Sequence, residues 1–184
     1  QGPEIRTAKN SEVLELVKGE QIILSSKKTK DMKKSLQIDN LKYVKGIKKN
    51  GRISLDNGSI DLKITRASKE KIYCDVLDNG QISGRKHVNF PGATISLPTI
   101  TDKDKRDLKF AASLGVDFVA LSFCRTKNDI NDLKKTLKSF KKEIELFVKV
   151  EDQQGLSNLE DIVSSSAWIM VARGDLGIET VITN

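Results

Sequence analysis

The sequence has few of the residues that define several protein classes. Only two cysteines, Cys74 and Cys124, occur in 184 residues, and neither has another cysteine or a histidine at ligand spacing. We therefore expect reduced thiols rather than a disulfide scaffold or a zinc site. No apolar run approaches the roughly 20 residues of a membrane-spanning helix, which predicts a protein outside the membrane. Because the N-terminus has neither methionine nor a signal-peptide pattern, we expect a segment of a longer chain.

Positive charge is concentrated in one stretch of the chain. The formal net charge is +7, and ten Lys/Arg against two Asp between Lys27 and Arg52 give that stretch +8, which leaves −1 for the remainder. Aromatic residues make up only 5% of the chain and do not alternate with these lysines, unlike in many nucleic-acid-binding surfaces. We therefore predict a solvated face and no nucleic-acid partner. A small RNA-binding β-barrel remains the alternative outside enzymes.

The first half of the chain has the pattern of short antiparallel strands. Apolar and polar residues alternate in Ser59–Thr65 and again in Ile72–Val76, as in half-buried strands. Asn-Gly dipeptides, which favour two-residue hairpin turns, occur at Asn50-Gly51, Asn57-Gly58 and Asn79-Gly80. We therefore predict a small β-barrel or sandwich over about Glu4 to Ile82.

From Pro98 onward the pattern predicts alternating helices and strands. Capping-box pairs start two helices, at Thr101 with Asp104 and at Thr126 with Asp129. A third helix is expected after Gly155, and strands are expected at Val116–Phe123, Leu146–Glu151 and Trp168–Ala172, with Trp168, Met170 and Phe147 in the core. Such repeats form parallel sheets or barrels.

These two patterns together predict an α/β fold. We expect part of a (β/α)8 TIM barrel with an inserted small antiparallel β-barrel domain. Residues 1–7 would be a barrel strand, residues 8–88 the inserted β-barrel, and residues 89–184 the (β/α) barrel portion that carries the site.

Polar or charged residues lie at the carboxyl end of each expected parallel strand. They are Ser122 and Arg125 at the first strand, Lys149 and Glu151 at the second, and Arg173, Gly174 and Asp175 at the third. Active sites of (β/α) barrels form at the carboxyl ends of the strands, because the loops converge there. We therefore predict the site at this edge of the sheet.

Lys149 and Glu151 lie two residues apart, so they share one face of the expected strand while Val148 and Val150 share the other. Two charges at such a position are costly unless a metal or an anionic substrate uses them. A structural salt bridge between the two side chains is the alternative. The sequence leaves both interpretations open.

The segment after the third strand adds a further oxygen ligand. Asp175 lies between Gly174 and Gly177 in an expected loop, where glycines permit close approach of the backbone to an anion. Carboxylates from Glu151 and Asp175 suit Mg²⁺ or Mn²⁺ better than zinc. An ammonium such as that of Lys149 beside such a metal suits phosphoryl transfer or enolate stabilisation.

Four separated motifs resemble pyruvate kinases, in that family's order and spacing. They are Gly2-Pro3-Glu4-Ile5-Arg6-Thr7, Val88-Asn89-Phe90-Pro91-Gly92-Ala93, Lys149-Val150-Glu151 and Val171-Ala172-Arg173-Gly174-Asp175-Leu176-Gly177. The resemblance implies phosphoryl transfer from phosphoenolpyruvate to ADP, giving pyruvate and ATP in glycolysis. It also implies Mg²⁺ (or Mn²⁺), K⁺ with ligands outside this chain, cytoplasmic localisation and a homotetrameric parent enzyme.

The same resemblance implies a role for each matching residue. Lys149 would be the catalytic residue, and Glu151 and Asp175 would be the metal ligands. Substrate contacts are expected from Lys149, Gly174, Asp175, Ser122 and Arg125. Nucleotide contacts are expected from Arg6, Lys86 and Asp56, under a lid formed by the β module.

Two other interpretations remain beside this one, a different enzyme and an inactive remnant. A magnesium-dependent lyase of the phosphoenolpyruvate-handling barrels would explain the α/β half but not the inserted β module. A truncated remnant without activity would keep the fold and lose catalysis. The 184 residues alone would leave an open sheet edge, so we expect this chain by itself to be inactive.

Overall fold

The computed structural model describes residues 4–9, 11–29, 34–68, 70–140, 143–166 and 168–180. They form two compact units, Glu4–Ser96, here called the β module, and the described residues from Leu97 to Thr180, here called the α/β unit. No described helix is long and apolar enough to cross a membrane. The boundaries expected from the sequence, after residues 7 and 88, stay predictions.

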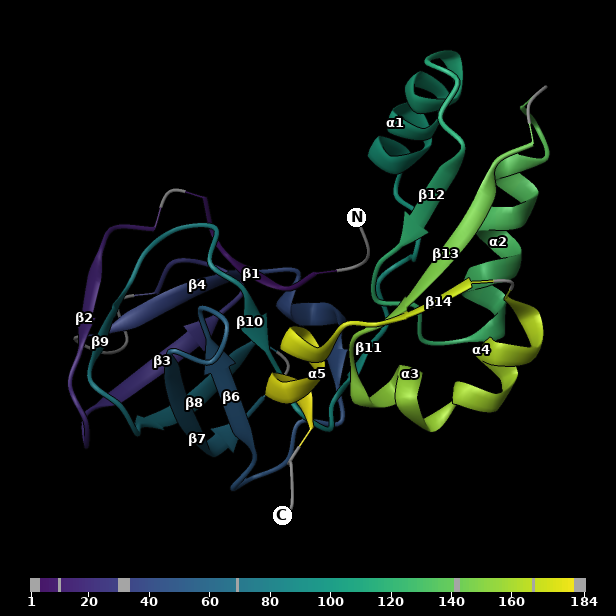
Figure 1. The fold of residues 1–184 in the computed structure, drawn as a ribbon. Coiled ribbons are helices and arrows are strands. Elements are labelled where there is room, and N and C mark those ends of the chain that lie inside the picture. The colour runs from purple at the N-terminus through teal and green to yellow at the C-terminus, as the bar shows by residue number, and fades with distance from the viewer. Residues whose placement is uncertain are drawn as a thin grey trace. The chain divides into compact units, whose positions relative to one another are not determined.

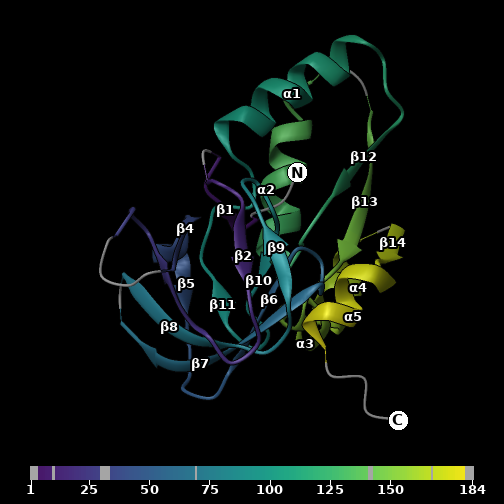
Figure 2. The same ribbon diagram turned by 90° about the vertical axis from the view of Figure 1, so that its left-hand side faces the viewer.

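The described residues of the β module form eleven short strands and one 3₁₀ helix (Figure 1). They are β1 (Arg6–Thr7), β2 (Leu14–Leu16), β3 (Gln21–Ser25), β4 (Ser35–Asp39), η1 (Leu41–Tyr43), β5 (Val44–Lys45), β6 (Arg52–Leu55), β7 (Ile60–Ala67), β8 (Lys71–Val76), β9 (Gly80–Ile82), β10 (Val88–Asn89) and β11 (Thr94–Ile95). Seven of them form one sheet in the order β1-β4-β3-β8-β7-β6-β10. The remaining four form two ribbons, β5 with β11 and β2 with β9, and the latter two run side by side in Figure 2.

The two ends of this sheet meet, so the sheet is nearly closed. Thr7 N donates to Lys86 O at 2.9 Å, and Val88 N donates to Ile5 O at 2.9 Å. These bonds join the segment around β1 to the segment around β10 and thereby satisfy backbone groups that an open edge would expose. Apart from the parallel pair of β3 and β4, the ladders are antiparallel. The predicted small antiparallel β-barrel is thus confirmed.

The three Asn-Gly dipeptides do not behave alike. Only Asn57-Gly58, between β6 and β7, has positive φ at both positions, 56° and 89°. Asn50 has φ 64° without a positive φ at Gly51, and Gly80 begins strand β9. The expected two-residue hairpin turns at Asn50 and at Asn79 were therefore wrong, because Asn50 and Gly51 form backbone hydrogen bonds with Ile64 of β7, and β9 pairs with β2 instead of β8.

The α/β unit contains the strands β12 (Phe118–Leu121), β13 (Glu145–Val150) and β14 (Trp168–Val171), which form a parallel sheet in that order. Its helices are α1 (Asp102–Ser113), α2 (Lys127–Leu137), α3 (Gln153–Ser157), α4 (Leu159–Ser165) and α5 (Arg173–Glu179). The predicted alternation of strands and helices is confirmed. Together with the β module, it gives the α/β class that the sequence predicted.

Both capping boxes expected from the sequence are present. Thr101 accepts from the amide of Asp104 at the start of α1, and Thr126 accepts from that of Asp129 at the start of α2. Gly115 follows the C-terminus of α1 with φ 77°, which the absence of a side chain permits. These local signals are strong because each satisfies backbone groups at a helix end.

Two expectations for the last third of the chain were wrong. The third helix is divided into α3 and α4 at Asn158, and Gly155 lies inside α3 instead of before it. The expected loop around Gly174 and Gly177 is the short helix α5. Glycine only weakens a helix, by about 1 kcal/mol relative to alanine, so two glycines did not prevent this seven-residue helix from forming.

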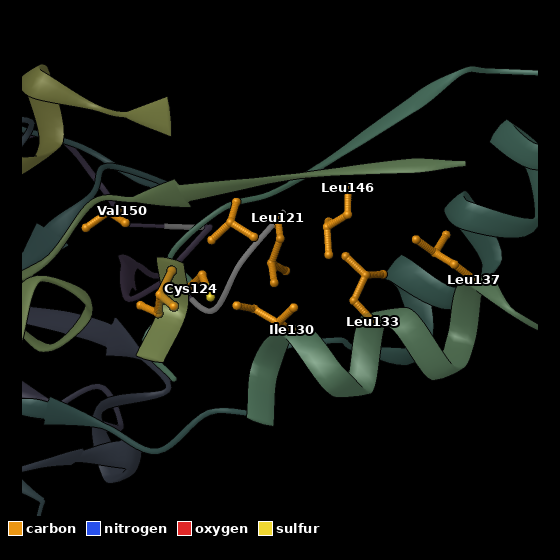
Figure 3. Packing of buried hydrophobic residues seen from close by; sticks show 9 residues of the cluster. Leu121, Cys124, Ile130, Leu133, Leu137, Leu146 and Val150 are labelled. Atoms are coloured by element: carbon orange, nitrogen blue, oxygen red, sulfur yellow. The ribbon is translucent and has the colours of Figure 1, made fainter. Parts of the chain in front are cut away.

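One apolar cluster lies between the sheet and α2 (Figure 3). Ile130, Leu133 and Leu137 of α2 point toward Leu121 and Leu146 of the sheet. The opposite face of the sheet carries Phe147, which contacts Phe118 at 5.3 Å and Trp168 at 5.5 Å between ring centroids. Trp168 and Met170 are 48% and 45% exposed, so placing them in the core was wrong.

Candidate active site

The candidate site in the α/β unit begins with a charged pair at the carboxyl end of β13, formed by Lys149 in the strand and Glu151 directly after it. Leu146, Val148 and Val150 are buried toward the helices, which places Lys149 on the other face of the strand. Lys149 Nζ lies 2.5 Å from Glu151 Oε1, and the two side chains are 24% and 2% exposed. The ion pair that the sequence left as an alternative therefore exists in the structure. A lysine and a nearly fully buried carboxylate meet at the carboxyl end of the strand.

The segment that follows β12 completes the surroundings of this pair. Lys149 Nζ donates to Ser122 Oγ at 3.3 Å. Phe123 N donates to Glu151 Oε2 at 2.5 Å, so each oxygen of the Glu151 carboxylate has a donor. Two charge-assisted hydrogen bonds offset part of the desolvation cost of the buried carboxylate. The structure thus brings together three of the predicted residues, Ser122, Lys149 and Glu151.

Arg125 lies next to this group and is itself buried. Arg125 Nε lies 2.5 Å from Asp152 Oδ2, and the side chains are 6% and 10% exposed. Asp152 Oδ1 also accepts from Gly155 N at 2.8 Å and so caps helix α3. Sequence reasoning missed Asp152, although an aspartate directly before a helix is a usable N-cap signal.

Asp175 and Gly174 follow the neighbouring strand, β14. Both lie in the first turn of α5, and the side chain of Asp175 is half-buried. Neighbouring parallel strands end at the same edge of a sheet, so Glu151 after β13 and Asp175 after β14 lie at that edge. Figure 1 shows the two strands and α5, which follows β14. Within the described part of the chain, no hydrogen bond or ion pair joins Asp175 to Lys149 or Glu151. A Cβ on Gly174 would have no atom within 4 Å, so packing does not require a glycine there.

The donor set at this edge fits a hard divalent cation. Glu151 and Asp175 offer carboxylate oxygens, and the described residues contain no group of three or more His, Cys, Asp or Glu that could hold a metal ion. Mg²⁺ often binds through one or two carboxylates and keeps its other positions for water and phosphate. Burial, with smaller contributions from carboxylates such as Asp129, raises the pKa of the Cys124 thiol to about 12.

A second charged group lies in the β module and contains the three residues predicted to contact nucleotide. Lys86 Nζ lies 2.8 Å from Asp56 Oδ2. Arg6 Nη1 donates to Arg85 O at 2.8 Å, and Arg6 Nε lies 2.5 Å from Glu4 Oε2. Sequence reasoning did not single out Arg85 and Glu4, the two partners of Arg6.

The near-closure of the sheet explains why these residues meet. The backbone of Arg6 forms an isolated antiparallel β-bridge with that of His87. The amide of Asp56 donates to His87 O at 2.9 Å. Residues 6, 56 and 86 thus come from three separate segments that one set of backbone hydrogen bonds holds together. The Lys86 and Arg6 side chains remain partly exposed, 40% and 35%, and so accessible to an anion.

The three-stranded parallel sheet with its helices, preceded along the chain by a small β-barrel module, has the architecture of a partial (β/α) barrel. The chain belongs to the pyruvate kinase family. The family model described as "Pyruvate kinase, barrel domain" matches residues 1–184.

Known proteins resemble the chain over nearly its whole length. It is 36% identical over 181 residues to a pyruvate kinase of Staphylococcus epidermidis and 37% identical over 182 residues to one of Staphylococcus saprophyticus. Each alignment covers 97% of this chain. The crystal structure of a pyruvate kinase from Cryptosporidium parvum superposes with a TM-score of 0.86 at 29% identity and covers 98% of this chain and 39% of that one. The chain spans 31% of the length of the two curated relatives. The lyase alternative is not favoured.

Proposed function

We propose that the protein containing this chain transfers the phosphoryl group of phosphoenolpyruvate to ADP, giving pyruvate and ATP in glycolysis. The observation that carries the proposal is the contact of Lys149 with the buried carboxylate of Glu151 at the carboxyl end of β13, in a chain of the pyruvate kinase family. An ammonium beside a carboxylate that can hold a metal suits the charge that develops in phosphoryl transfer.

Each residue of the α/β unit then has a role. Glu151 and Asp175 hold Mg²⁺ or Mn²⁺, which supplies positive charge to the phosphate and to the enolate oxygen when it is bound. Lys149 is the catalytic residue, and its ammonium lies against the transferring phosphoryl group and the enolate. Gly174 can offer its backbone to the substrate, since a Cβ there would have no described atom within 4 Å.

Ser122 and Arg125 support the substrate side of the site in different ways. Ser122 accepts a hydrogen bond from Lys149 and so directs the ammonium. The Arg125 guanidinium is buried against Asp152. It therefore supports substrate binding indirectly, because it fixes the segment between β12 and α2 that lies at the substrate-binding edge of the sheet.

In the β module, Arg6 and Lys86 bind the phosphates of ADP, and Asp56 holds the Lys86 side chain in place. We propose that the module acts as a lid that excludes water from the transfer. K⁺ is a further cofactor, with ligands outside this chain. The parent enzyme is proposed to be a cytoplasmic homotetramer without a membrane or nucleic-acid partner.

The proposal is tested with the complete protein as its source produces it. Expected is formation of ATP and pyruvate in equal amounts from phosphoenolpyruvate, ADP and Mg²⁺, and no pyruvate when ADP is left out. The 184-residue chain alone, measured beside it, is expected to be inactive. Pyruvate formation without ADP would favour a lyase, and no turnover by the complete protein would favour the inactive remnant.

A further inference from the structure

The turn Phe123–Thr126 connects β12 with α2 and is bonded to the end of β13. Phe123 N donates to Glu151 Oε2 at 2.5 Å, and Cys124 N donates to Lys149 O at 3.3 Å. Phe123 is a buried, bulky residue with φ 50°, a left-handed conformation that such residues rarely adopt. Strain of this kind persists only where surrounding contacts hold it, and it concentrates at functional sites.

The contacts that hold this turn converge on Arg125. Its guanidinium bonds Asp152 Oδ2 and lies 5.7 Å from the centroid of the Phe123 ring. Its carbonyl accepts from Asn158 Nδ2 at 2.9 Å, and the second oxygen of Asp152 caps α3 at Gly155. One arginine thus ties the turn after β12 to the residue that directly follows Glu151 and to the helix beyond it.

Packing around the same turn leaves little freedom. A Cβ on Gly155 would lie 2.6 Å from the carbonyl oxygen of Cys124, so α3 approaches the turn closely. Asp129 Oδ2 accepts from Arg125 N at 3.0 Å and from Thr126 N at 2.8 Å. A buried ion pair contributes little to stability when it is compared with apolar residues of the same size. A role in geometry therefore explains the Arg125–Asp152 pair better than a role in stability.

We propose that the Arg125–Asp152 pair is a positioning device for the Glu151 carboxylate. The pair fixes the backbone on both sides of the hydrogen bond from Phe123 to Glu151, and so holds the carboxylate in the orientation in which it receives a divalent cation. This inference rests on the proposed function and deepens it by assigning Arg125 and Asp152 to the metal side of the site. Residues that orient a metal ligand typically change metal affinity 10–100-fold when they are removed, to order of magnitude.

The test is binding of Mn²⁺ to the complete protein without substrates, measured by electron paramagnetic resonance, together with the melting temperature. Arg125→Met is expected to raise the dissociation constant of Mn²⁺ about 10-fold or more and to lower the melting temperature, because Asp152 is left buried without its cation. Arg52→Met is the matched control: it removes another paired arginine, 2.8 Å from Asp61 in the β module, and should leave Mn²⁺ binding unchanged.

The double variant Arg125→Met/Asp152→Asn separates positioning from stability. Asparagine keeps the cap of α3 and leaves no unpaired buried charge, so the melting temperature should recover while Mn²⁺ binding stays weak. Recovery of both quantities, or unchanged Mn²⁺ binding in Arg125→Met, would overturn the proposal. If Arg125→Met does not fold, Arg125→Lys takes its place with the same expectation for Mn²⁺. Wild-type protein that binds Mn²⁺ but makes no ATP would contradict the proposed function and not the positioning role.

Discussion

Lys149→Met in the complete protein is expected to lower the rate of ATP formation from phosphoenolpyruvate and ADP by about 10²–10³-fold or more. Methionine keeps the apolar stem of the lysine and removes its positive charge. The negative charge that develops on the transferring phosphoryl group and the enolate then has no ammonium beside it. The fold should remain, with a lower melting temperature, because the buried Glu151 loses its cation but keeps the hydrogen bond from the amide of Phe123. A steady-state assay with circular dichroism on the same sample measures both quantities.

The matched control for this prediction is Lys134→Met. Lys134 lies on α2 and donates to Ser165 O at 2.7 Å on the protein surface, so the same substitution there should leave turnover unchanged. Turnover of Lys149→Met within a few-fold of wild type would remove Lys149 from the catalytic role. Equal losses in both variants would point to a general effect of the substitution.

Glu151→Gln is expected to weaken Mn²⁺ binding about 100-fold or more and to lower turnover with it, because a neutral amide replaces one of two anionic ligands in a buried position. The amide oxygen of glutamine still accepts from Phe123 N, so the backbone of the turn keeps its partner. Titration of Mn²⁺ by electron paramagnetic resonance measures the affinity. Turnover at saturating Mg²⁺ shows how much of the loss is binding.

Glu145→Gln is the corresponding control. Glu145 lies on the same strand and face, at the other end of β13, where its carboxylate accepts from Trp168 Nε1 at 2.5 Å. The same chemical change at that end should not alter Mn²⁺ affinity. Unchanged affinity in Glu151→Gln would mean that the cation is held elsewhere.

Much of this architecture could be predicted because it follows from local signals. Thr101 and Thr126 start helices by satisfying backbone amides that have no other partner, and the alternation of Ile60, Leu62 and Ile64 sets one face of a strand. The meeting of Lys149 with Glu151 followed from their spacing on a strand, since residues two apart share a face. Each of these inferences needs only a few neighbouring residues.

Other features depend on contacts between distant segments and so had no local signal. The left-handed backbone of Phe123 is held by Glu151 and by the pair of Arg125 with Asp152, residues that lie up to 29 positions along the chain. Trp168 is exposed because no layer covers its face of the sheet in the described chain. A large aromatic residue at the start of an expected buried strand had predicted a place in the core. The roles of individual site residues stay predictions for the same reason, because they depend on ligands.

The measurement that tests the account most directly is the position of Mn²⁺ in a crystal of the complete protein, located by its anomalous scattering. We expect one peak in contact with carboxylate oxygens of both Glu151 and Asp175, close to Lys149. A peak bound by other residues, with these two carboxylates free of metal, would contradict the assignment of the active site to the carboxyl ends of β13 and β14.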